Sequence, residues 1–350
     1  MACFLEGLRF GLLVYNRRPA LSGTAGISRR NRAELMATKD RAYKPEEEKR
    51  LLKPALAILQ SLRIRQWVKN SLVFLPFLFA VNQVWAPGNL AAVPQTLLHL
   101  LGVFLGFCAL SSAVYLMNDL ADREEDRQHP GKRHRAIASG QLPVPGAVVL
   151  SLMLVAVGLA LMGLNRPMLV GVGLLYLVIN LTYSLGAKRL VLVDVMLVAS
   201  GYVIRAAAGA LAINVIPSPW LYAVTAAGAL FIVLGRRYAE LRLASDDLGG
   251  QRPVLLAYRG PLIGQLLGIA ATAALVSYTL YTVEAPGLPD NNSMLLTVPL
   301  VTLGLFRYLY LLNASEEAEY PEQLIVRDLP LVASILFWIA ASALVLVLNN

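Results

Sequence analysis

The sequence predicts an all-α integral membrane protein with nine transmembrane helices. Of its 350 residues 57% are hydrophobic and only 15% are charged, a composition far more apolar than that of soluble proteins. Nine apolar runs follow one another, each near the roughly 20 residues that cross a bilayer as a helix. Almost all of the 31 Lys and Arg residues lie before the first run or in alternate loops. This alternation predicts a chain that crosses the membrane repeatedly.

The apolar runs are separated by short polar loops, several of them rich in Pro and Gly. Pro217-Ser218-Pro219 and Ala285-Pro286-Gly287 are two such breaks. We therefore expect spans at 68–86, 97–117, 144–164, 168–187, 190–211, 220–236, 262–283, 293–312 and 329–348.

The basic residues also predict the orientation of the chain in a cell membrane. Cytoplasmic loops carry an excess of Lys and Arg, which places the N-terminus and the basic loops in the cytoplasm. An odd number of spans then places the C-terminus outside. The net charge of +9 is explained by this topology and by anionic lipid headgroups, so it does not indicate nucleic-acid binding.

Two parts of the chain differ in composition. Residues 1–50 combine a short apolar stretch, too short to span a bilayer, with an Arg-rich polar segment, and we expect a flexible basic tail there. Residues 51–350 form the expected transmembrane catalytic domain.

The most informative motif is an acidic cluster at the end of the second apolar run. Asn118, Asp119, Asp122 and Asp126 fall within about 100° of one another on a helix, because spacings of 3, 4, 7 and 8 residues return to the same side. Three carboxylates so close repel one another unless a cation lies among them. Mg²⁺ prefers such hard oxygen ligands and commonly bridges carboxylates to the phosphates of a substrate. Glu124 lies on the opposite face, where solvation alone explains it.

A basic segment follows the acidic cluster directly. Lys132, Arg133 and Arg135 are the donors that phosphates need. A basic run after a membrane helix is usually a topology signal, but beside the carboxylates it favours a site for a phosphorylated substrate. His129 and His134 are either phosphate donors or ordinary loop histidines.

A second polar segment ends the fourth run and begins the fifth. Asn180, Ser184 and Lys188 repeat every four residues, so they share one helix face. Asp194 and Arg205 are eleven residues apart and point in nearly the same direction. We expect this segment to face the acidic cluster across a shared cavity. Arg205, deep in its span, either contacts a substrate or forms a structural ion pair with another helix.

Polar residues also mark the start of the first span and the end of the sixth. Arg63, Gln66 and Asn70 follow helical spacing, and Arg236 and Glu240 form an i,i+4 pair that we interpret first as stabilising.

The motifs in order are Gln66-Trp67-Val68-Lys69-Asn70, Asn118-Asp119-x-x-Asp122-x-x-x-Asp126, His129-Pro130-x-Lys132-Arg133-x-Arg135, Tyr183-Ser184 with Lys188 and Asp194, Arg205-Ala206-x-Ala208-Gly209, and Arg237-Tyr238-Ala239-Glu240. Over about 60–348 the chain resembles the UbiA superfamily of intramembrane prenyltransferases. Within it the chain resembles the decaprenyl-phosphate phosphoribosyltransferase branch, which makes a lipid-linked ribose for cell-wall arabinan.

The resemblance implies a nine-helix bundle around a central cavity open to the cytoplasm and to lipid. The donor would be phosphoribosyl pyrophosphate, the acceptor a polyprenyl phosphate, and the cofactor Mg²⁺ on Asp119, Asp122 and Asp126; a homo-oligomer is compatible with it. Catalytic roles would fall to Asp119, Asp122, Asp126, Lys188 and Asp194, and substrate contacts to Lys69, Asn70, Asn118, Lys132, Arg133, Arg135, Tyr183, Arg205, Arg237 and Tyr238.

Two alternatives remain open at this point. An aromatic prenyltransferase of the same superfamily would carry a second Asp-rich motif, but Asp194 has Leu190 and Val198 four residues to either side. A transporter would spread its polar residues through the depth of the bilayer, whereas here they gather at one face with Arg205 as the exception.

Overall fold

The computed structural model describes residues 56–80, 83–86, 90–216, 218–243, 254–314 and 327–348. The tail expected at 1–50 lies outside these residues. Eight helices in the described part are long and apolar enough to cross a membrane. They are α5 (Val93–Ala121), α7 (Val144–Asn165), α8 (Pro167–Leu185), α9 (Val193–Ala212), α10 (Pro219–Leu243), α12 (Pro261–Glu284), α13 (Val298–Ala314) with the 3-10 helix η4 (Ser293–Thr297) before it, and α15 (Leu329–Leu348).

The expected spans from the second run onward correspond to these eight helices. The first expected span, 68–86, is instead a 3-10 helix η1 (Ile64–Phe74) that continues into a short α4 (Leu75–Leu78). Pro76 lacks an N–H, so it cannot donate an α-helical bond to Leu72, and the ring favours a helix start at this point. The all-helical membrane fold is confirmed, and the ninth span stays a prediction.

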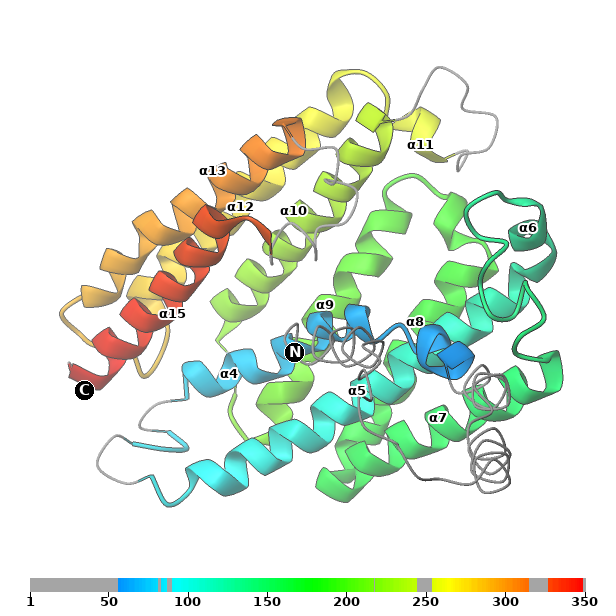
Figure 1. The fold of residues 1–350 in the computed structure, drawn as a ribbon. Helices are drawn as coiled ribbons and strands as arrows, with labels where there is room; N and C mark the ends of the chain where they lie inside the picture. Colours follow the sequence, from blue (N-terminus) through cyan, green and yellow to red (C-terminus); the bar gives the residue numbers. More distant parts are fainter. Residues whose placement is uncertain are drawn as a thin grey trace, which may run out of the picture. The chain divides into compact units, whose positions relative to one another are not determined.

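The long helices pack in two groups (Figure 1). In one, α5 packs against α7, α7 against α8, and α8 against α9; in the other, α10 packs against α12 and α13 against α15. Contacts between α9 and α10 connect the groups, and η1 lies against α5 and α9. Each group has its own apolar core.

Small residues let α5 and α7 approach closely. A Cβ built on Gly158 would lie 2.9 Å from the carbonyl oxygen of Gly106, and one on Gly106 would lie 3.2 Å from that of Gly158. Such contacts between backbones are typical of helices that associate in lipid, where packing replaces the hydrophobic effect as the driving force.

The outer helices expose large apolar side chains. Leu152 and Met153 of α7, Leu174 and Val178 of α8, and Phe337 of α15 are all exposed. Exposed apolar surface of this extent is characteristic of helices that contact lipid. The protein is therefore a multi-pass membrane protein.

Candidate active site

A polar cavity of about 680 Å³ lies where the two helix groups meet. Its lining comes from η1, α5, the loop after α6 (Arg123–Gln128), α8, α9, α10 and the short α11 (Val254–Ala257). Seven of the lining side chains are basic and three are acidic, and the positive excess favours an anionic ligand. The basic ones are Arg63, Lys69, Lys132, Arg135, Arg205, Arg236 and Arg237, and the acidic ones are Asp119, Asp122 and Glu240.

The acidic cluster does not lie on one continuous helix. Helix α5 ends at Ala121, Asp122 is the junction, and α6 begins at Arg123. Asp119 and Asp126 are nonetheless close together, because Nη1 of Arg135 contacts Oδ1 of Asp119 at 3.1 Å and Oδ2 of Asp126 at 2.7 Å. Nη2 of Arg63 donates to Oδ1 of Asp119 at 2.5 Å. Guanidinium groups therefore neutralise two of the three carboxylates.

The second polar segment faces the acidic cluster, as the sequence predicts. The Ser184 hydroxyl on α8 donates to Oδ1 of Asn118 at 2.6 Å. Nζ of Lys188, in the 3-10 turn η2 (Ala187–Arg189), lies 3.6 Å from Oδ1 of Asp122. The ends of α5 and α8 are thus tied together on one side of the cavity.

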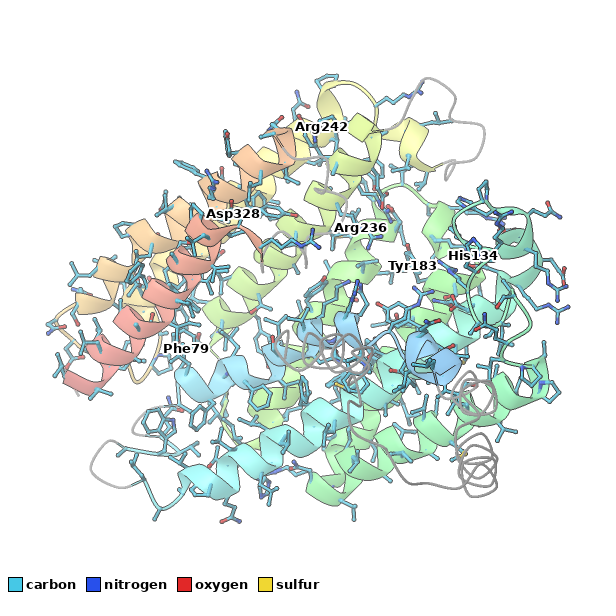
Figure 2. All side chains as sticks on the ribbon, in the orientation of Figure 1. Phe79, His134, Tyr183, Arg236, Arg242 and Asp328 are labelled. Carbon is cyan, nitrogen blue, oxygen red and sulfur yellow. The ribbon has the colours of Figure 1, made fainter. Side chains whose placement is uncertain are left out.

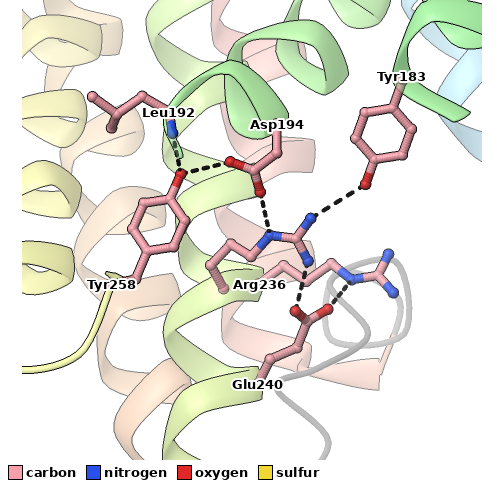
Figure 3. Close-up of polar contacts among 7 residues, drawn as sticks. Tyr183, Leu192, Asp194, Arg236, Glu240 and Tyr258 are labelled. Carbon is pink, nitrogen blue, oxygen red and sulfur yellow. Dashed lines mark hydrogen bonds and ion pairs between the residues drawn. The ribbon is translucent and has the colours of Figure 1, made fainter. Parts of the chain in front are cut away.

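Asp194 organises a separate buried network that ends at the cavity (Figure 3). Its fully buried carboxylate accepts from Nε of Arg237 at 3.1 Å and from the Tyr258 hydroxyl at 2.6 Å. Arg237 also donates to Glu240 at 2.6 Å and to the Tyr183 hydroxyl at 3.4 Å. The carboxylate of Asp194 therefore fixes the Arg237 side chain, which lines the cavity.

Tyr258 stabilises an unusual backbone conformation beside Asp194. Leu192, which precedes α9, has φ of 68°, a left-handed value that is rare for a residue with a side chain. The Leu192 N–H donates to the Tyr258 hydroxyl at 2.7 Å. Burial and the hydrogen bond to Asp194 raise the pKa of Tyr258, so the phenol stays protonated and remains a donor.

Arg205 is buried and makes contacts with three groups. Nε donates to Oδ1 of Asn70 at 2.7 Å, Nη1 to the Gly201 carbonyl at 2.6 Å, and Nη2 to the Tyr176 hydroxyl at 3.0 Å. The guanidinium also lies over the Tyr176 ring, 4.8 Å from its centroid. These three partners are uncharged, so the contacts are hydrogen bonds and not the ion pair with another helix that the sequence left open; the expected substrate contact stays a prediction, and Arg205 lies in the cavity wall.

The predicted site residues divide by location. Those that line the polar cavity are Lys69, Asn118, Asp119, Asp122, Lys132, Arg135, Tyr183, Arg205 and Arg237. Those that lie behind its wall or away from it are Asn70, Asp126, Arg133, Lys188, Asp194 and Tyr238. The Tyr238 hydroxyl donates to Asn313 of α13 at 2.6 Å, and Arg133 is exposed beside His134.

Several lining residues had no assigned role in the sequence. Arg236, interpreted from the sequence as a partner of Glu240, also lines the cavity, and Figure 2 shows it on a different helix group from Tyr183. Tyr115 and Tyr202 line the cavity, each three residues before a predicted site residue, Asn118 and Arg205. Helical spacing from those residues was the signal that could have found them.

The three carboxylates expected to hold Mg²⁺ do not all line the cavity. Among the described residues no three Asp, Glu, His or Cys side chains form a metal-binding group. Asp119 and Asp122 line the cavity, while Asp126 is buried and holds Arg135. Because Mg²⁺ delivered with a phosphorylated substrate typically takes only one or two protein carboxylates, the Asp119 and Asp122 side chains fit that ion.

The motifs and this fold match a known family. The family model for the UbiA prenyltransferase family matches residues 73–324. The chain belongs to the UbiA prenyltransferase family. The match confirms the resemblance to the UbiA superfamily that the sequence motifs indicate.

Curated relatives within the family share most of this chain's length. A Mycobacterium tuberculosis protein named decaprenyl-phosphate phosphoribosyltransferase is 34% identical over 283 residues, which cover 81% of this chain and 92% of the relative. A protein of the same name from Corynebacterium glutamicum is 31% identical over 81% of this chain and 84% of its own length.

Solved structures share the fold at low sequence identity. A UbiA homologue from Archaeoglobus fulgidus bound to GPP and Mg²⁺ has a TM-score of 0.62 at 18% identity, covering 83% of this chain and 99% of the homologue. A UbiA homologue from Aeropyrum pernix has a TM-score of 0.55 at 19% identity, covering 83% of this chain and 98% of its own.

Proposed function

We propose that this protein transfers the 5-phosphoribosyl group of phosphoribosyl pyrophosphate to a polyprenyl phosphate of the decaprenyl class and releases pyrophosphate. One observation carries the proposal: the positive polar cavity adjoins an apolar cavity of about 490 Å³, and Lys69, Tyr202 and Ile232 line both. A polyanionic soluble donor and an apolar acceptor with an anionic end fit the two cavities and meet where they join. The names of the curated relatives support this substrate pair.

The basic side chains of the polar cavity bind the donor in this proposal. Phosphoribosyl pyrophosphate carries a pyrophosphate at the anomeric carbon and a second phosphate at C5. Arg135 and Arg237 enter the cavity from opposite helix groups, and guanidinium groups bind phosphate oxygens in a bidentate manner. Lys132 adds a point charge from the loop after α6.

The transfer exchanges one C–O bond for another at the anomeric carbon. An oxygen of the acceptor phosphate forms a bond to that carbon while the bond to pyrophosphate breaks, and pyrophosphate leaves with the bonding pair. The acceptor phosphate is already an anion, so no general base is required. Charge builds on the leaving pyrophosphate, and the positive lining of the cavity stabilises it.

Asp119 and Asp122 are the side chains that would hold Mg²⁺. When bound, this ion neutralises charge on the leaving pyrophosphate. Asp126, Lys188 and Asp194 act as positioning residues in this proposal: Asp126 holds Arg135, Lys188 contacts Asp122, and Asp194 holds Arg237. The site faces the cytoplasm, where the soluble donor is found, in line with the basic loops.

The test is a transfer assay with purified protein in detergent. Labelled phosphoribosyl pyrophosphate, Mg²⁺ and decaprenyl phosphate are incubated, and label that becomes extractable into organic solvent is counted. We expect transfer by the natural protein and a loss of at least about 100-fold in Asp122→Asn, since even indirect partners of a metal ligand commonly cost 10–100-fold. Mn²⁺ binding, followed by electron paramagnetic resonance, should weaken in the same variant.

The matched control is Glu124→Gln, two residues away on α6. Glu124 is exposed, lies outside the cavity lining, and within the described part of the chain forms ion pairs with Arg123 and Arg127. It should retain full activity. If the natural protein gives no lipid-linked label but couples a prenyl diphosphate to an aromatic acid, the proposed function is wrong and the aromatic prenyltransferase reading replaces it.

A further inference from the structure

The apolar cavity extends along α10, which gives a scale for its depth. Leu221, Val224, Gly228 and Ile232 of this helix line it, and Ile232 also lines the polar cavity. At 1.5 Å per residue, Gly228 lies about 6 Å and Leu221 about 16 Å from the junction of the two cavities. Successive residues of α10 therefore lie at increasing distances from the polar cavity along the apolar cavity.

Aromatic side chains line the cavity at the level of Leu221. Leu221 packs with Tyr278 and Tyr281 of α12, and Phe79 and Trp338 pack against the same cluster. Phe79 and Tyr281 have ring centroids 5.1 Å apart, and those of Tyr278 and Trp338 are 6.2 Å apart. Figure 2 shows Phe79 at the end of α4, well away from Arg236 at the polar cavity.

Hydrogen bonds fix this aromatic cluster. The Tyr278 hydroxyl accepts from Nε1 of Trp338 at 2.6 Å and lies 2.6 Å from Oγ1 of Thr297. Moving the Tyr278 or the Trp338 ring would break their hydrogen bond inside an apolar region, where unpaired polar groups are costly. Tyr278 and Trp338 are therefore held in place by hydrogen bonds as well as by packing.

We infer that the apolar cavity encloses only about the first four isoprene units of the acceptor lipid, that the aromatic cluster ends the enclosed segment, and that the missing side chain at Gly228 makes the room. This inference rests on the proposed function and deepens it. An apolar cavity of 150 Å³ accommodates benzene, or roughly 25 Å³ per carbon, so about 490 Å³ holds about 20 carbons. The remaining six units of a decaprenyl chain must lie outside the cavity.

Gly228 offers direct access to this space. A Cβ at Gly228 would meet no heavy atom within 4 Å, whereas one at Gly235, two turns along α10, would lie 2.9 Å from Tyr308. A larger side chain at 228 therefore enters the cavity rather than colliding with the protein. By the same volume per carbon, a Phe at this position removes roughly a third of the cavity, one turn from the junction.

The experiment measures transfer to acceptors of two, four and ten isoprene units: geranyl, geranylgeranyl and decaprenyl phosphate. The natural protein should show acceptor KM values within about threefold for four and ten units, because the segment beyond four units is not enclosed. Gly228→Phe should lower kcat/KM at least tenfold for these two acceptors and less than threefold for two units. The KM for phosphoribosyl pyrophosphate should not change.

The control is Gly268→Phe, which places the same side chain on an exposed position of α12 outside the cavity. It should leave all three acceptors unaffected, and Gly228→Ala should do the same. Gly228→Leu serves as a second blocking variant if the Phe variant does not fold, as judged by its thermal unfolding midpoint.

A binding measurement separates this inference from the proposed function. Geranylgeranyl phosphate should raise the unfolding midpoint of the natural protein and of Gly268→Phe, but not that of Gly228→Phe. If transfer occurs and Gly228→Phe treats all three acceptors alike, the inference is wrong while the function stands. If the natural protein transfers to no acceptor, the proposed function is wrong. In that case, stabilisation by geranylgeranyl phosphate that is lost in Gly228→Phe would still support an isoprenoid-binding site. If geranylgeranyl phosphate does not stabilise the natural protein either, the isoprenoid-binding site is also wrong.

Discussion

Replacing Asp194 by Asn tests whether the buried network of Figure 3 serves the site or only the fold. The carboxylate is fully buried, and its main cationic partner, Arg237, is 3% exposed. Asn is nearly the same size and keeps one oxygen acceptor. It loses the negative charge and offers an amide N–H₂ where the second oxygen accepted a hydrogen bond. The substitution therefore perturbs Arg237 without creating a cavity.

The expected loss of stability follows from the Asp194–Arg237 ion pair, and the expected loss of activity follows from a contact between Arg237 and the donor. Breaking a buried ion pair by removing one partner costs about 3–5 kcal/mol, but Glu240 remains as a second anion for Arg237 at 2.6 Å. We therefore expect about 3 kcal/mol of destabilisation. If Arg237 then loses one charge-assisted hydrogen bond to the donor, worth about 1.5–3 kcal/mol, kcat/KM for phosphoribosyl pyrophosphate should fall about 10–100-fold.

The assay combines unfolding in detergent with transfer kinetics at varied donor and acceptor. The KM for phosphoribosyl pyrophosphate should rise while the KM for the acceptor stays within twofold, a split that a merely structural role would not produce. Asp328→Asn is the matched control, because Asp328 pairs with Arg307 of α13 away from both cavities. A donor KM within twofold of the natural value in Asp194→Asn would refute the positioning role.

Two further predictions concern stability. Gly209→Ala should destabilise the protein by about 1–3 kcal/mol or more, because the added Cβ collides with the Val73 carbonyl where α9 crosses η1. The control Gly171→Ala should not destabilise the protein, because the space around its Cβ is open. Thermal unfolding of the two variants and the natural protein makes the comparison. Hydrogen bonds from Arg307 lower the pKa of Asp328 in the folded protein. The ionised carboxylate therefore stabilises the fold above about pH 4, and this contribution is lost as the pH falls further. The difference in unfolding midpoint between Asp328→Asn and the natural protein should persist at pH 7 and vanish in the acidic range.

The helical architecture was predictable because it depends on local features. Length and apolarity alone identify the eight long helices, and Pro at the first turns of α5, α7, α8 and α12 marks where they begin. The segment 64–78 resisted this approach. Its polar residues form hydrogen bonds to helices distant in the sequence, such as that of Asn70 with Ser111. These tertiary contacts cannot be deduced from the apolar pattern that predicts a simple span.

The lining of the candidate site was predictable in its residue types but less in its pairings. The polar segments at the ends of α5 and α8 were expected to face each other, and Ser184 and Asn118 confirm this. Arg205 and Asn70, by contrast, are 135 positions apart, and no local period indicates that they touch. The expectation that Asp119 and Asp126 share one continuous helix was wrong, because the chain turns at Asp122 and a guanidinium brings the two carboxylates together.

That guanidinium changes the argument for a metal. Repulsion among three neighbouring carboxylates requires a cation, and Arg63 and Arg135 supply two positive charges within 3.1 Å of Asp119. Charge balance alone is thus satisfied by the protein, so the case for Mg²⁺ rests on the chemistry of the substrate instead. A donor that brings several negative charges into this cavity competes with Asp119 for the same guanidinium groups, and a carboxylate released from Arg135 becomes a free oxygen ligand. Donor binding and metal binding at this site should therefore strengthen each other. The metal would bind the Asp119 carboxylate that the donor displaces from Arg135, and the donor would bind the Arg135 guanidinium that the metal displaces from Asp119.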